Sequence, residues 1–106
     1  MAEDFLDTLE AVIRARKGGD PATSYVAKLF TRGRAKIAQK LGEEATETVI
    51  AALGDDKGAL TGEAADLVFH LLVLLADAGV SFDDVRAELR RREGVSGIEE
   101  KAGRAN

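Results

Sequence analysis

The sequence EAADLVFHLLVLLADA, at residues 63–78, decides the fold class of this chain. It contains no proline, and its leucines and alanines are strong helix formers, so it predicts a helix that stops at Gly79. Residues 67–75 are apolar apart from His70, and this run is shorter than the roughly 20 residues that span a bilayer. A helix that is apolar on every side must be surrounded by other helices. Because the chain has only 106 residues, we expect a bundle that is completed by a second copy, a homodimer.

Apolar residues at helical spacing also predict helices on both sides of this segment. The expected ranges are about 4–16, a short helix over 25–30 capped by Asp20 or Thr23, 34–53, 59 or 62 to 78, and 81 to 93. Ser81 and Asp84 resemble a capping box, and Val85 and Leu89 are expected to face inward. No stretch alternates as a strand does. The prediction is therefore an all-α bundle of four to five helices in one domain over 1–93, with a loosely ordered tail over 94–106.

The composition excludes several classes of protein. The chain has 15 basic and 19 acidic residues, a formal net charge of −4, which argues against non-specific binding to nucleic acid or to anionic membranes. It has no cysteine, so disulfides and thiolate metal sites are excluded. The acidic start, Met1–Asp4, does not resemble a signal peptide, and we expect a cytoplasmic protein.

Carboxylates occur on the inward face of the helix expected over 34–53. At about 100° per residue from Ile37, Leu41 lies on the inward stripe and Glu44 lies in the middle of it. Glu47 lies at the edge of this stripe, and Glu43 points further out. Lys40 lies beside Glu47 on the same wheel.

The next long helix repeats the pattern, because Glu63 and Asp66 lie on or beside the face that carries Leu67. Burying an unpaired carboxylate costs several kcal/mol (order of magnitude), and carboxylates that face one another repel. A hard divalent cation removes this cost, and ligands that are all oxygen suit Mg²⁺ or Mn²⁺. The alternative is that each acidic pair is solvated or paired with Lys and Arg.

The spacing Glu44-x-x-Glu47 followed by Glu63-x-x-Asp66 resembles the signature of the all-α nucleoside triphosphate pyrophosphohydrolases, the MazG-like superfamily. Within it, the segments at 24–30, 40–47, 63–75 and 92–98 are similar to the stand-alone bacterial phosphoribosyl-ATP pyrophosphohydrolases. The resemblance implies an all-α homodimer in the cytoplasm that depends on Mg²⁺. It also implies hydrolysis of 1-(5-phosphoribosyl)-ATP to 1-(5-phosphoribosyl)-AMP and pyrophosphate, the second step of histidine biosynthesis.

The same resemblance assigns roles to the acidic residues. Glu44, Glu47, Glu63 and Asp66 would hold the metal, which would bridge phosphate oxygens and position the attacking water. Glu43 is the spare candidate for a general base, and which carboxylate fills that role stays open.

Cations and one histidine accompany the acidic pairs. Arg32, Arg34 and Lys36 cluster ahead of them. Each alone is interpreted as a solvated charge, but a substrate rich in phosphate needs cations. Lys40 either pairs with Glu44 and Glu47 or contacts a substrate phosphate. The single histidine, His70, is expected to be a hydrogen-bonded core residue that can support a neighbouring metal ligand.

Three other functions compete with this interpretation. The same acidic site would serve a housecleaning pyrophosphatase that acts on dUTP, dCTP or damaged nucleotides. A non-catalytic helical interaction module would not need carboxylates on its inward faces. A di-iron carboxylate bundle would carry Glu-x-x-His, which is absent here. The chain also lacks a P-loop, so phosphates must be bound by metal and side chains.

Overall fold

The computed structural model describes residues 4–94 of the chain. Within that range it consists of helices and the turns between them, which confirms the all-α prediction. The helices are α1 (Phe5–Ala15), α2 (Tyr25–Arg32), α3 (Arg34–Ala52), α4 (Lys57–Ala78) and α5 (Phe82–Arg91). Most of the predicted tail lies outside the described residues.

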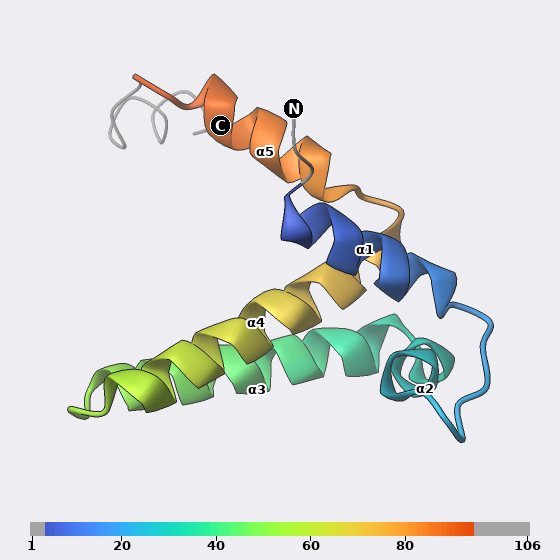
Figure 1. The fold of residues 1–106 in the computed structure, drawn as a ribbon, viewed down its shortest axis with the longest axis horizontal. Coiled ribbons are helices and arrows are strands. Elements are labelled where there is room, and N and C mark those ends of the chain that lie inside the picture. The colour runs from blue at the N-terminus through green and yellow to red at the C-terminus, as the bar shows by residue number, and fades with distance from the viewer. Residues whose placement is uncertain (1–3, 95–106) are drawn as a thin grey trace.

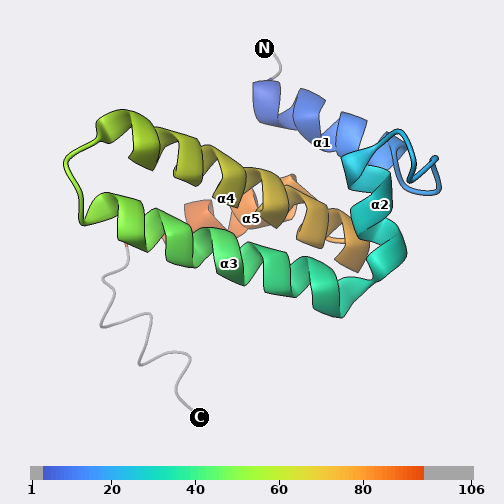
Figure 2. The ribbon, with the colours of Figure 1, turned by 90° about the horizontal axis from the view of Figure 1, so that it is seen from below.

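The two longest helices, α3 and α4, run antiparallel and form a hairpin (Figures 1 and 2). The short helix α2 packs at the end of this hairpin where α3 begins, and it is seen nearly end-on in Figure 1. α1 crosses the C-terminal half of α4, and α5 leaves the hairpin on the side of α1 (Figure 1). The other half of the hairpin, which carries the α3–α4 turn, therefore extends beyond the other helices.

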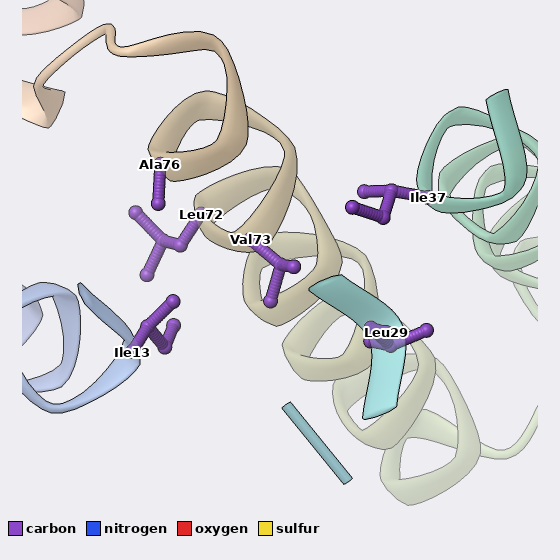
Figure 3. Packing of buried hydrophobic residues seen from close by; sticks show 6 residues of the cluster. All are labelled: Ile13, Leu29, Ile37, Leu72, Val73 and Ala76. Carbon is purple, nitrogen blue, oxygen red and sulfur yellow. The ribbon is translucent and has the colours of Figure 1, made fainter. Parts of the chain in front are cut away.

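The hydrophobic core lies where α1, α2, α3 and α4 meet (Figure 3). Each helix contributes to it, and the fully or nearly fully buried members are Ile13, Leu29, Ile37, Leu72, Val73 and Ala76. Only these residues and Ala27 form the buried apolar set of the described chain. The apolar run at 67–75 is thus enclosed on one side only, and Val68 remains 36% exposed. The homodimer that this run suggested stays a prediction.

Helix ends differ from the sequence prediction in two places. The cap of α2 is Ser24, whose side chain accepts from the backbone N–H of Ala27, and not Asp20 or Thr23. Asp20 instead accepts from Ala22 within the preceding turn. α4 begins at Lys57, before the predicted start at 59 or 62, because Asp56 caps it.

Two predicted helix signals are confirmed. Gly79 ends α4 in the left-handed conformation at φ +75°, which costs glycine no steric strain. Ser81 and Asp84 form a reciprocal capping box at the start of α5.

Polar contacts attach α5 to α1. Arg86 bonds Asp7 of α1 at 2.6 Å, and the backbone N–H of Phe82 donates to the carboxylate of Glu10 at 2.7 Å. The opposite face of α5 has no neighbouring helix within residues 4–94, so Leu89 is 60% exposed and the prediction that it faces inward is wrong. Val85 is partly buried.

As a whole, α4 is longer than the apolar run at 67–75. In its 22 residues one window reaches a mean hydropathy of 1.7, so by length and composition alone this helix could cross a membrane. The core helix of a soluble protein has the same property. Here α4 packs on α1, α2 and α3 and carries the acidic residues described next.

Candidate metal centre

The α3–α4 hairpin positions the predicted acidic residues. Glu44 and Glu47 lie on α3, and Glu63 and Asp66 lie on the facing part of α4. Thr48 links the two helices, because its hydroxyl lies 2.8 Å from the carbonyl oxygen of Glu44 and 3.2 Å from that of Glu63. This contact sets the register in which the two acidic pairs face each other.

Three carboxylates converge at this point. One oxygen each from Glu44, Glu63 and Asp66 can be chosen so that all lie within 4.8 Å of one another. The Oε2 atoms of Glu44 and Glu63 are buried and have no hydrogen-bond partner. Buried polar atoms are normally satisfied, so two orphaned carboxylate oxygens in one cluster indicate a missing positive partner. Oxygen donors at this spacing fit a hard divalent cation.

The pKa of Glu63 also reflects the crowding of carboxyl groups in this cluster. A hydrogen bond with Glu47 is the main cause that raises the pKa of Glu63 above its ordinary value, and burial and the charges of Glu47, Glu44 and Asp66 raise it further. The carboxyl groups of all four predicted residues therefore interact. Glu47 is more exposed than Glu44 and contacts the cluster through Glu63. The structure brings three of them into one possible ligand set and places Glu47 beside it.

Glu43 points away from this cluster, as the helical wheel predicted. Its carboxylate accepts from Gln39 at 2.9 Å and from Lys40 at 3.3 Å. These two hydrogen bonds hold the pKa of Glu43 below its ordinary value. Glu43 and Glu47 line an open groove on the outer side of α3 together with Gln39, Gly42, Thr46 and Ile50. Its role as a general base stays a prediction.

The four predicted substrate-binding cations occupy different surroundings. Arg32 and Lys40 line a small pocket between α2 and α3. Arg34 bonds the carboxylate of Asp77 at 2.6 Å and the carbonyl oxygen of the same residue at 3.2 Å, which ties the start of α3 to the end of α4. Lys36 is partly buried on α3 and is not among the residues that line the pocket.

His70 is buried and fully hydrogen-bonded, as predicted. It is 6% exposed, and its Nε2 lies 2.9 Å from the hydroxyl of Tyr25. Its Nδ1 lies 2.7 Å from the carbonyl oxygen of Asp66, one turn earlier on α4. A carbonyl can only accept, so Nδ1 donates to it, and Nε2 pairs with the hydroxyl of Tyr25. His70 thus connects α2 to the backbone of a candidate metal ligand.

Comparison with known proteins agrees with this geometry. The model of the phosphoribosyl-ATP pyrophosphohydrolase family matches residues 6–93. This chain belongs to the phosphoribosyl-ATP pyrophosphohydrolase family. A relative named phosphoribosyl-ATP pyrophosphatase from Rhizorhabdus wittichii is 68% identical over 99 residues, which are 93% of each chain.

Further members of the family are nearly as similar. Proteins with the same name from Novosphingobium aromaticivorans and Zymomonas mobilis are 63% and 62% identical, and each alignment covers at least 96% of both chains. The resemblance to the phosphoribosyl-ATP pyrophosphohydrolases, inferred from the segments at 24–30, 40–47, 63–75 and 92–98, is therefore confirmed.

The sequence analysis predicted the helix α2 of this phosphoribosyl-ATP pyrophosphohydrolase fold but did not name Tyr25 and Lys28 among the candidate binding residues. Tyr25 and Lys28 line the same pocket as Arg32 and Lys40, and Tyr25 also contacts His70. The signal was present, since Tyr25, Lys28 and Arg32 are three and four residues apart and share one helix face. This helix face could be assigned to a pocket only from the structure, because Lys40 on α3 forms the other wall.

Proposed function

We propose that this chain hydrolyses 1-(5-phosphoribosyl)-ATP to 1-(5-phosphoribosyl)-AMP and pyrophosphate, the second step of histidine biosynthesis. The observation that carries the proposal is the cluster of Glu44, Glu63 and Asp66 within 4.8 Å, in a chain that matches the family from residue 6 to residue 93. A helical interaction module has no need of two buried carboxylate oxygens without partners.

The proposed cofactor is Mg²⁺, with Mn²⁺ as a substitute. Glu44, Glu63 and Asp66 would hold it, and Glu47 would join them on the side of Glu63. When bound, the ion would neutralise charge on the phosphate oxygens and lower the pKa of a coordinated water. Other residues of the chain would orient these ligands. Thr48 joins α3 to the backbone of Glu63, so that the two acidic pairs face each other. His70 holds the turn of α4 that carries Asp66.

The cations next to the cluster bind the phosphates in this proposal. Lys40 is the nearest candidate, because it lies on the same helix as Glu44, one turn earlier. Arg32 faces the same pocket. Arg34 already has Asp77 as a carboxylate partner, so we propose mainly that it supports the fold, and Lys36 contributes charge nearby. Glu43 remains the candidate for accepting a proton from water.

The proposed assembly is a homodimer in the cytoplasm, with no nucleic acid or membrane partner. Large apolar side chains are exposed on the second half of α3 and at its C-cap, which supports the proposal that a second copy of the chain packs on the hairpin. Val49, Ile50 and Leu53 are 60%, 64% and 84% exposed. A lipid cover is disfavoured, since α4 presents Glu63 and Asp66 in its first half and ionised groups are costly inside a bilayer.

One assay tests the reaction and its specificity together. Release of pyrophosphate is measured from 1-(5-phosphoribosyl)-ATP, ATP, dUTP and dCTP, each with and without Mg²⁺. The proposal expects the highest kcat/KM for 1-(5-phosphoribosyl)-ATP and no turnover without a divalent ion. A preference for dUTP or dCTP would instead identify a housecleaning pyrophosphatase, and the histidine pathway would be the wrong assignment.

A further inference from the structure

A small pocket between α2 and α3 is lined by three cations and contains no carboxylate. Its lining residues are Tyr25, Lys28, Leu29, Arg32 and Lys40. The cavity measures about 90 Å³, far less than the roughly 300–1,000 Å³ of pockets that enclose whole ligands. It is sized for one small group rather than for a nucleotide.

Of the three positive charges in this pocket, the described part of the protein balances only that of Lys40. Lys40 has a carboxylate partner in Glu43 at 3.3 Å. Lys28 and Arg32 have no ion-pair partner in the part of the chain that the structure describes, 4–94. Two uncompensated cations in a chain of net charge −4 favour an anion. A phosphate monoester fits, since it carries about −1.5 to −2 charges at neutral pH and accepts several hydrogen bonds.

The pocket adjoins the candidate metal centre through two connections. Tyr25 in its wall bonds His70, and His70 bonds the carbonyl oxygen of Asp66, at 2.9 and 2.7 Å. Lys40 precedes Glu44 by four residues, which is about 6 Å along the axis of an α-helix. A single substrate can therefore place one phosphate in the pocket and other phosphates at the carboxylates.

We infer that Lys28 and Arg32, with Tyr25 and Lys40, form a subsite for a phosphate monoester at the end of the substrate away from the bond that is cleaved. This inference rests on the proposed function. In 1-(5-phosphoribosyl)-ATP the occupant is the 5-phosphate of the ribose that ATP lacks. The triphosphate lies at the acidic cluster, so the two phosphate sites are distinct.

The subsite gives a physical basis for choosing this substrate over ATP. ATP has no phosphate to place in this subsite. Lys28 and Arg32 therefore lack, in the ATP complex, the hydrogen bonds that they donate to the 5-phosphate of 1-(5-phosphoribosyl)-ATP. Such bonds are among the stronger ones in proteins, and losing one costs about tenfold or more in affinity. Lys28 acts on binding and not on the metal-centred step, because it lies on α2, outside the acidic cluster.

The first test compares Lys28→Gln, Lys28→Arg and the control Lys57→Gln by steady-state kinetics with 1-(5-phosphoribosyl)-ATP. Lys57 is an exposed lysine at the start of α4, next to the far turn of the hairpin. We expect Lys28→Gln to raise KM about tenfold or more with kcat changed far less. Lys28→Arg should restore most of the loss, and Lys57→Gln should behave as the wild type. Equal KM for Lys28→Gln and the wild type would overturn the subsite while the proposed reaction stands.

The second test is independent of turnover. Binding of ribose 5-phosphate to the wild type and to Lys28→Gln is followed by NMR titration, with ribose as the uncharged comparison. The subsite predicts that ribose 5-phosphate shifts the amide signals of α2, that ribose does not, and that Lys28→Gln weakens the binding about tenfold. If the wild type does not cleave 1-(5-phosphoribosyl)-ATP, the reaction is wrong, and this titration still decides the pocket. Identical titrations of wild type and variant, or no binding at all, would reject it.

Discussion

Glu44 on α3 and Glu63 on α4 each bury one carboxylate oxygen that has no hydrogen-bond partner. The two residues belong to a cluster whose oxygens lie within 4.8 Å, so their negative charges face each other across the hairpin. Such an arrangement is unfavourable without a cation, and two of its three carboxylates lie on α4, the most apolar of the helices that the structure describes. Under the proposed function, the cluster lowers the stability of the metal-free protein and gains a bound ion in return.

Mg²⁺ is expected to stabilise the folded protein. Because the carboxylates converge only in the folded hairpin, binding shifts the equilibrium toward that state, by about 2.7 kcal/mol when the free ion is at 100 times its dissociation constant. Thermal unfolding with EDTA and with rising Mg²⁺ measures the shift. NaCl at matched ionic strength is the control, because general screening would act equally in both salts. A melting temperature that follows ionic strength alone would contradict a specific site.

Neutralising one ligand should separate activity from stability. Glu44→Gln and Glu63→Gln keep the shape of the side chain and remove one charge, so the metal-free protein should be at least as stable as the wild type. Mg²⁺-dependent turnover should fall by more than the about 10- to 100-fold that is common for loss of a group supporting a ligand. The measurements are kcat with saturating substrate and thermal unfolding in EDTA. Turnover close to that of the wild type in both variants would remove these residues from the site.

The acidic cluster was predictable from sequence because it depends on local periodicity. Once 34–53 and 63–78 are helices, spacing alone puts Glu44 and Glu63 on inward faces. The cap of α2 was not predictable in the same way, because Asp20, Thr23 and Ser24 are all good cap residues and lie within five positions.

Features that depend on how helices are placed were harder to predict. The pocket around Lys28 exists because the turn at Gly33, with φ +88°, sets α2 across the start of α3. Leu89 was expected inside because its helix is amphipathic, but periodicity gives a face and not the neighbour that would cover it.

Arg86 should control whether α5 stays docked on α1. Its guanidinium bonds Asp4 and Asp7 at 3.0 and 2.6 Å, and also Asp83 of its own helix at 2.8 Å. Arg86→Ala removes these bonds and is expected to speed amide exchange in α5 several-fold while α3 and α4 stay protected. Arg86→Lys keeps the charge but loses the fork of donors, so it should give an intermediate result. Unchanged exchange in α5 of Arg86→Ala would show that the hydrogen bond from the Phe82 backbone to Glu10 suffices to dock it.

Glu88 should contribute stability that depends on acid pH. Hydrogen bonds from Arg91 and Arg92 lower the pKa of Glu88 to about 2 from its ordinary value of 4.5. A carboxyl with a lowered pKa in the folded state stabilises the protein above its unfolded pKa, and this contribution is lost as the pH falls toward the folded value. The free energy of unfolding of wild type minus Glu88→Gln should thus be small and positive near neutral pH and approach zero as the pH falls through the folded pKa of about 2. A difference that does not vary with pH would mean that these ion pairs do not form in solution.

Substitutions of Ile37 in α3 and of Leu53, the C-cap of the same helix, should differ in how their effect depends on protein concentration. Ile37 is 0% exposed in the core, whereas Leu53 is 84% exposed at the end of the same helix. Ile37→Ala creates a cavity and should cost about 2–5 kcal/mol at any concentration. In a single chain, Leu53→Ala would stay within about 0.5 kcal/mol of the wild type, as exposed substitutions usually do. If a second copy covers the hairpin, Leu53→Ala and Leu53→Glu instead weaken association, so their melting temperatures fall with dilution more steeply than that of the wild type. Light scattering across a dilution series reads the mass directly, and a folded wild-type monomer at micromolar concentration would defeat the proposed homodimer.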